Sequence, residues 1–125
     1  MSHSFETIVT PTPSLNVTKK MHHGETKRLR RMFGLELLAA GRAGVGRPWA
    51  SWPESKRRVT ITRVSPRSLD LDNLVGGAKA LLDSMRDVGL LKDDSPEWLE
   101  VTYAQRRPEQ AGQRAYTHVK VEVLE

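Results

Sequence analysis

Cysteine is absent from the 125 residues of the chain, and no apolar run approaches the roughly 18 residues of a membrane span. Without cysteine, disulfide bonds, thiolate nucleophiles and cysteine-based metal sites are excluded. The first four residues lack the charged and apolar regions of a signal peptide. Gly-rich phosphate loops, G-x-S-x-G elbows and H-E-x-x-H pairs are also missing, so P-loop, triad-esterase and zincin chemistry has no support. We expect a cytoplasmic protein with no membrane partner.

Acidic residues are scarce in the first part of the chain. Residues 1–69 hold 13 Lys and Arg against 4 Asp and Glu, whereas residues 70–125 hold 7 against 11. A basic half beside an acid-rich half indicates a polyanionic partner such as DNA, although a charge excess alone is more typical of a merely soluble basic surface. For a DNA partner, the candidate contacts are the side chains of Lys19, Lys20, Lys27, Arg28, Arg31, Arg57 and Arg58.

Hydrophobic periodicity predicts one α+β domain over residues 1–125, with a small mixed sheet of about four strands and two main helices. Apolar residues alternate with polar ones in the strand candidates, which are 4–10, 57–64, 98–106 and 115–124. Helical spacing appears in 25–40 and 73–88, with a polar loop over 14–24 and an irregular segment over 41–54. The loop 107–114 suggests a hairpin between the last two strands.

Acidic residues gather around the second predicted helix. If Asp72 is its N-cap, Lys79 and Asp83 return to within roughly 20° of the direction of Asp72, so the three form a row on one face. Gly76 lies on the same face and leaves room beside the carboxylates. The opposite face carries the predicted core stripe, Leu74, Ala78, Leu81, Met85 and Val88.

Three further carboxylates flank this helix. Asp70 precedes it, and Asp93 and Asp94 follow a turn at Gly89. If the segment 90–91 folds back along the helix, three or four carboxylates converge with Lys79. Hard oxygen ligands of this kind select Mg²⁺ or Mn²⁺, and such an ion activates water for attack on a phosphodiester.

Each feature alone also has an ordinary structural explanation. Asp72 is typical of a helix cap, Lys79 and Asp83 of a surface ion pair, and the segment 93–96 of a turn. The histidines at 22 and 23 fit a solvated loop better than a metal site. The tryptophans at 49 and 52 fit hydrophobic anchors better than base-stacking platforms. Because these acids occur together and beside a basic half, a functional site and an ordinary structural role explain them about equally well.

The acidic segment resembles the RusA family of Holliday-junction resolvases, small nucleases typical of phages and prophages. The family carries a D-x-D-N motif, then a lysine, an aspartate four positions later, and an Asp-Asp pair. The matching residues are Asp70-Leu71-Asp72-Asn73, Lys79, Asp83 and Asp93-Asp94. The segment 11–16, PTPSLN, is similar to the proline-rich opening of the family, and the predicted closing hairpin fits it too.

The resemblance implies a homodimeric endodeoxyribonuclease that resolves four-way junctions or other branched DNA in recombination and repair. By analogy, Asp70, Asp72 and Asp94 are the catalytic metal ligands for Mg²⁺, with Mn²⁺ as the substitute. Asp93 assists, and Lys79 is the catalytic lysine. The sequence departs from the pattern in one place, because Lys79 follows Asn73 by six residues where three are expected. A non-catalytic DNA-binding dimer that keeps the fold is the alternative.

Overall fold

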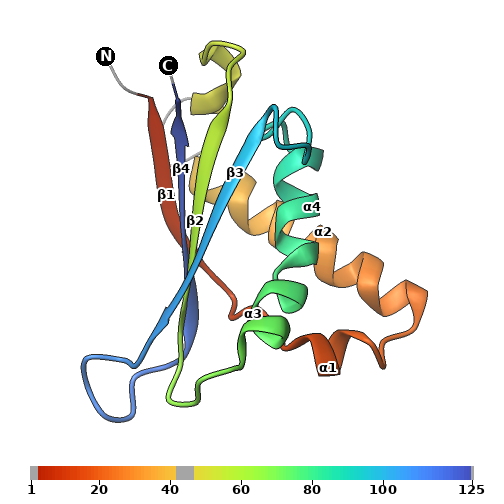
Figure 1. The fold of residues 1–125 in the computed structure, drawn as a ribbon, viewed down its shortest axis with the longest axis vertical. Helices are drawn as coiled ribbons and strands as arrows, with labels where there is room; N and C mark the ends of the chain where they lie inside the picture. Colours follow the sequence, from red (N-terminus) through yellow and green to blue (C-terminus); the bar gives the residue numbers. More distant parts are fainter. Residues whose placement is uncertain (1–2, 42–46, 125) are drawn as a thin grey trace.

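The computed structural model describes residues 3–41 and 47–124 (Figure 1). Four strands and several helices form an α+β fold, which confirms the predicted class and the four-stranded mixed sheet. In chain order, the elements are β1 Ser4–Val9, α1 Leu15–Thr18, α2 His23–Gly41, the 3₁₀ helix η1 Pro48–Ser51, β2 Arg57–Val64, α3 Leu71–Gly77, α4 Lys79–Asp87, β3 Leu99–Arg106 and β4 Tyr116–Val123.

The strand order in the sheet is β1-β4-β2-β3. Strand β4 is antiparallel to both of its neighbours, whereas β2 and β3 are parallel. At the centre of the sheet, Ile61 is aligned with Val119 on one side and with Tyr103 on the other. The connection from β2 to β3 through α3 and α4 is therefore a β-α-β crossover.

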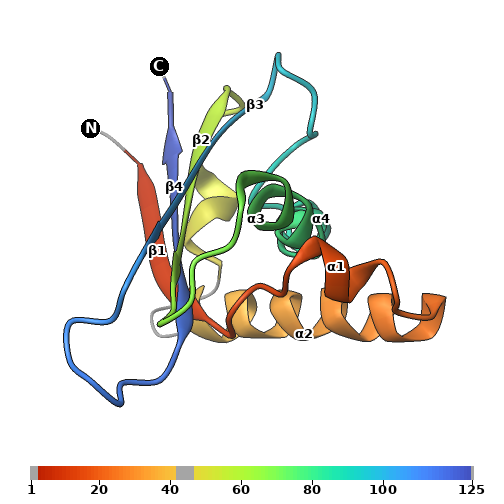
Figure 2. The ribbon, with the colours of Figure 1, turned by 60° about the horizontal axis from the view of Figure 1, so that its bottom comes forward.

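The predicted hairpin between the last two strands is wrong. Strands β3 and β4 lie on opposite sides of β2, and the connection between them passes the end of that strand (Figures 1 and 2). The crossover places β3 beside β2 in parallel. The antiparallel β4 then pairs on the other side of β2, where β1 extends the sheet. Alternation of apolar residues predicts strands but not their neighbours, which explains the error.

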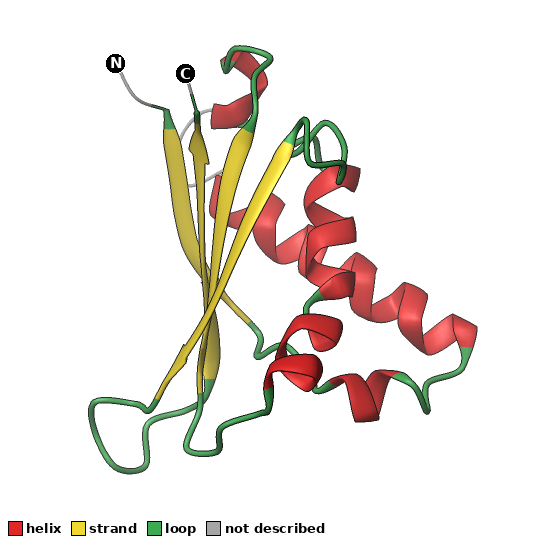
Figure 3. Ribbon diagram, viewed as in Figure 1, coloured by secondary structure: helices red, strands yellow, loops and turns green. Residues whose placement is uncertain are grey.

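All helices cover one face of the sheet, and no helix of the described residues lies on the other (Figures 2 and 3). Alternate strand residues point to the helices: Val59 and Ile61 of β2 and Val119 and Val121 of β4 are fully buried. Helices α2 and α4 cover them with Phe33, Leu37, Leu81 and Met85, which are also fully buried. Within residues 3–41 and 47–124, no helix is long and apolar enough to cross a membrane.

The predicted helix over 73–88 is two helices. Helix α3 ends at Gly77, and α4 begins at Lys79, with Ala78 as the residue between them. The core stripe is nevertheless confirmed, since all five of its residues are buried: Leu74, Ala78, Leu81, Met85 and Val88. Gly89 follows the C-cap Val88 with φ +84°, the left-handed conformation that ends a helix at a glycine.

A short helix replaces part of the predicted loop over 14–24. Ser14 caps α1 with its side chain, which accepts a hydrogen bond from the backbone N–H of Val17. Helix α2 then begins at His23. The irregular segment 41–54 contains η1, whereas its residues 42–46 lie outside the described ranges. Trp49 is buried and donates its indole N–H to the backbone oxygen of Val88 over 2.9 Å, which confirms its role as an anchor.

Candidate functional site

Asp70 and Asp72 lie at the start of α3, and Asp70 is the N-cap. The prediction that Asp72 caps the helix is therefore wrong. The Oδ1 atom of Asp70 accepts hydrogen bonds of 2.9 Å from the backbone N–H and the side-chain amide of Asn73. These bonds, the backbone one first, lower the pKa of the Asp70 carboxyl below its ordinary value. Asp72 occupies the first turn, where its exposed carboxylate is not used as the cap.

The two aspartates line a surface hollow of about 580 Å³. Lys19, at the C-terminal end of α1, lines the same hollow. Asn73 joins the two sides, because its side-chain oxygen accepts the backbone N–H of Asn16 over 2.9 Å. The hollow therefore combines exposed carboxylate oxygens, a lysine and amide groups. This is a donor set that suits a hard cation or a phosphate beside one.

Close backbone packing places α1 beside α3. A Cβ atom on Gly77 would lie 1.7 Å from the backbone oxygen of Pro13, and one on Gly76 would lie 2.7 Å from the Leu15 side chain. Gly76 therefore makes room for Leu15 rather than for the carboxylates, which corrects the prediction. The segment 11–16 is thus in contact with the first part, 70–77, of the segment 70–94 that carries the rest of the resemblance. The Gly-Gly pair in the sequence was the available signal of this close approach.

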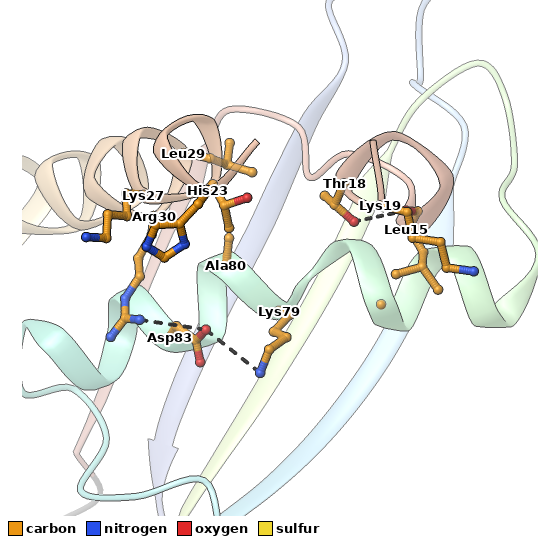
Figure 4. Close-up of a pocket in the computed structure, with 12 residues that line it drawn as sticks. Leu15, Thr18, Lys19, His23, Lys27, Leu29, Arg30, Lys79, Ala80 and Asp83 are labelled. Atoms are coloured by element: carbon orange, nitrogen blue, oxygen red, sulfur yellow. Dashed lines mark hydrogen bonds and ion pairs between the residues drawn. The ribbon is translucent and has the colours of Figure 1, made fainter. Parts of the chain in front are cut away.

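Lys79 and Asp83 belong to a second cluster, around α2 and α4. The Nζ atom of Lys79 and the Nη1 atom of Arg30 each lie 4.0 Å from Oδ2 of Asp83 (Figure 4). Arg30 also donates two hydrogen bonds, of 2.6 and 2.5 Å, to the carboxylate of Asp87. These bonds raise the pKa of Arg30 and lower the pKa of Asp87. Lys79 remains 78% exposed, so it is available to a ligand.

The predicted Asp72–Lys79–Asp83 row is interrupted at Ala78. Asp72 lines the hollow at the start of α3, whereas Lys79 and Asp83 line a different one beside α2. The two hollows are adjacent, because Leu15, Lys19 and Gly76 line both of them. The added residues before Lys79 therefore coincide with a helix break.

Asp93 and Asp94 lie beyond the other end of α4. Their Oδ1 atoms are each 3.8 Å from Nη1 of Arg86, in the last turn of that helix. Leu90 and Leu91 both donate backbone N–H groups to the oxygen of Met85, which keeps the segment 90–91 at the last turn of α4. Because Asp93 and Asp94 contact Arg86 of the same turn, they lie at this end of the helix and not at its start. The nine residues of α4 span roughly 13 Å, so one chain keeps this pair apart from Asp70.

The four aspartates therefore do not converge within one chain. In the described part of the chain, no group of three or more histidine, aspartate or glutamate side chains is close enough to hold a metal ion. The predicted intrachain cluster is replaced by two acidic pairs, Asp70 with Asp72 and Asp93 with Asp94. Arg86 pairs with Asp93 and Asp94, and Arg30 pairs with Asp83 and Asp87. The sequence analysis did not single out either arginine.

The predicted DNA-contacting residues divide among three environments. Most are exposed on α1, α2 or the turn between them: Lys19, Lys20, Lys27, Arg28 and Arg31. Arg58 lies on the helix-free face of the sheet and donates to Glu100 over 2.7 Å. Arg57 is buried, donates to the backbone oxygens of Leu90 and Pro53, and has its pKa lowered by burial. Its prediction as a DNA contact is corrected, because a buried guanidinium held by carbonyls does not face phosphates.

Comparison with known proteins adds no relative. No protein-family model matches the chain, and no curated protein matches it. The resemblance to RusA therefore depends on the motif residues themselves, in the segments 11–16 and 70–94.

Proposed function

We propose that the chain is a metal-dependent endodeoxyribonuclease that cuts branched DNA as a homodimer. One observation carries the proposal: segments far apart in the sequence pack together around exposed Asp70 and Asp72, with Lys19 beside them. These segments are the ones in which the sequence resembles the RusA family. Helices α1 and α2 lie on the same side of the sheet as α3 (Figure 2). The exposed basic residues of α1, α2 and the turn between them would supply charge for phosphates.

The hollow supplies two of the oxygen ligands that a hard divalent cation needs. Asp70 is held in its ionised form by two N–H donors, and Asp72 adds a second exposed carboxylate. When bound there, Mg²⁺ would supply water activation and charge neutralisation at a phosphodiester. Lys19 would bind a phosphate oxygen at the edge of the hollow. Lys79, exposed on the neighbouring helix, would neutralise charge that develops on the phosphate.

A dimer would also solve the separation of the two acidic pairs. In a two-fold dimer, each contact is made twice, so the start of α3 in one protomer can face the end of α4 in the other. Asp70 and Asp72 would then share a site with Asp93 and Asp94 of the partner subunit. The side chains of Asp93 and Asp94 are 50% and 63% exposed, so they are accessible to a second copy. Two such sites suit a four-way junction, which needs two cuts.

The second candidate is a DNA-binding dimer without catalysis. It is favoured by the ion pairs of Asp83 with Arg30 and of Asp93 and Asp94 with Arg86, which give these acids a structural role. A cleavage panel of four-way junction, fork, flap and duplex DNA with Mg²⁺ separates the two candidates. Product that forms with Mg²⁺ and disappears with a chelator supports the nuclease. Binding without product on every substrate supports the alternative.

A further inference from the structure

A second hollow, of about 360 Å³, lies between α1, α2 and α4 (Figure 4). Its lining is predominantly apolar and includes Leu15 from α1, Leu29 from α2 and Ala80 from α4. The volume lies in the range of pockets that hold small organic groups. Because it is open to solvent and apolar inside, it is suited to a flat group that is only partly hydrated.

Positive charge surrounds the opening. Lys19, Lys27, Arg30 and Lys79 line the hollow, against the single carboxylate of Asp83. Arg30 is engaged by Asp87, and Lys79 lies 4.0 Å from the single carboxylate of Asp83 while its side chain stays 78% exposed. Lys19, the C-cap residue of α1, and Lys27 of α2 add two further exposed positive charges, so the cations outnumber the carboxylate at the rim. An apolar interior with cations at the rim is complementary to a nucleotide, in which a flat base is joined to an anionic phosphate.

The hollow adjoins the one that contains Asp70 and Asp72. Leu15, Lys19 and Gly76 line both, so α1 forms the boundary between them. Asp72 of α3 and Lys79 at the start of α4 are seven positions apart, on the order of 10 Å at the rise of a helical residue. A DNA strand advances 3.4 Å per nucleotide along a duplex, so both hollows are within reach of a few successive nucleotides.

We propose that the hollow between α1, α2 and α4 binds an unpaired nucleobase of the branched DNA, while Lys19, Lys27 and Lys79 bind the flanking phosphates. This assignment rests on the proposed function, and it names the feature of the substrate that the protein recognises. In fully paired DNA the bases are stacked inside the helix and cannot enter the hollow. Near a branch point or in a flap, a base is free to do so. The hollow therefore gives a preference for branched over duplex DNA.

The test uses flap DNA with 2-aminopurine at the first unpaired position, and a duplex with the same base in a paired position. Both are titrated with the full chain in EDTA, so that binding is measured without metal. Thr26 lines the hollow from an exposed position on α2, so Thr26→Phe reduces its volume without altering the core. Thr26→Val keeps the volume. Thr102→Phe, at an exposed position of β3, is the matched control outside the hollow.

We expect the parent protein and the Thr26→Val and Thr102→Phe variants to change the emission of the unpaired base, with no change in the duplex. Thr26→Phe should abolish this change and weaken flap binding about tenfold, the typical contribution of one base contact. Its affinity for the duplex and its melting temperature should match those of the parent. An unchanged emission response in Thr26→Phe, or an equal response from the paired base, would overturn the proposal.

Two further readouts keep this proposal distinct from the nuclease itself. Cleavage in Mg²⁺ without any emission response overturns the base pocket and leaves the nuclease intact. An emission response without cleavage on any substrate overturns the nuclease and supports the pocket. A fluorescent acidic amphipathic peptide is the competing ligand. If the parent binds it, Thr26→Phe does not, and unpaired DNA fails to displace it, the hollow is a protein-docking site and the nucleobase assignment is overturned.

Discussion

The backbone N–H of Asn16 donates to the side-chain oxygen of Asn73 over 2.9 Å, although the two residues are 57 positions apart. Asn73 in turn donates two hydrogen bonds to Asp70. The residue that orients the first aspartate of the candidate site is therefore itself held by α1. The position of Asp70 consequently depends on the packing of the segment 11–16 against α3, and not only on the local geometry of the helix start.

This packing predicts that Gly77→Ala is destabilising. The new methyl group would lie 1.7 Å from the Pro13 oxygen, so the backbone of one segment must move. We expect a loss of about 1–3 kcal/mol in the free energy of unfolding, the usual range for overpacking. Gly34→Ala is the matched control, because its Cβ would meet Val88 at an ordinary 3.6 Å and the change favours the helix. Urea denaturation measures both, and equal stability of the two variants would contradict the prediction.

Asp72→Asn separates chemistry from folding. Asp70, not Asp72, caps α3, so the neutral amide at 72 should leave the melting temperature unchanged. The loss of one full charge should abolish Mg²⁺-dependent cleavage of a junction, while binding in a gel shift persists. Asp70→Asn should behave in the same way, because asparagine and aspartate rank together as caps. Cleavage by Asp72→Asn at the parental rate would exclude this carboxylate from the chemistry.

Mixed dimers test whether the site is shared between protomers. If Asp72 acts with Asp94 of the partner subunit, a dimer of Asp72→Asn with Asp94→Asn has one site with both residues changed and one intact site. We expect each variant alone to be inactive and the mixture to regain single-strand nicking of a junction. If each site is confined to one chain, no intact site forms and the mixture remains inactive. Light scattering that shows only one 14.1 kDa chain per bound DNA molecule would contradict the shared site directly.

The salt dependence of DNA binding identifies the basic contacts. If 6–10 phosphates are bound, affinity should fall roughly 10³–10⁵-fold between 50 and 200 mM salt. Lys27→Gln should reduce the slope by about one, as expected for the loss of one phosphate contact. Arg57→Gln should leave the slope unchanged but lower the free energy of unfolding by about 1–3 kcal/mol, because the buried Arg57 side chain donates to the backbone oxygens of Leu90 and Pro53. A flat salt response in the parent protein would exclude DNA as the partner.

The ion pair between Arg30 and Asp87 predicts a stability change at acidic pH. Hydrogen bonding to Arg30 lowers the folded-state pKa of Asp87 below its ordinary value of 3.8. The contribution of this pair is therefore fully present above the unfolded-state pKa and is lost as the pH falls through the folded value. In Asp87→Asn, the melting temperature should be lower than the parental one at neutral pH, and the difference should shrink below about pH 4. A difference that does not depend on pH would contradict the pair's role.

Part of the site was accessible from the sequence. Asp70 and Asp72 were identified as adjacent exposed acids, and Lys79 with Asp83 as an i, i+4 pair, because these relations depend on a few residues of one helix. The sequence could not predict that Asp70 rather than Asp72 is the N-cap, because aspartate is a good cap at either position and only the packing of the helix start selects one of them. The burial of Arg57 was also missed. A basic residue at the start of a strand is normally exposed, and here the carbonyl of Leu90, 33 positions away, and the nearby carbonyl of Pro53 hold its guanidinium inside.

The sequence by itself determined the four strands, the long helix α2 and the buried stripe of α3 and α4. Alternation predicted the four strands, and helical spacing predicted the buried stripe of α3 and α4, because both periods follow from backbone geometry that each residue shares with its neighbours. Only the tertiary structure decided the order of the strands, the break at Ala78 and the separation of Asp93 and Asp94 from Asp70. These depend on contacts such as that of Pro13 with Gly77, which join residues far apart in the chain and leave no periodic signal in the sequence.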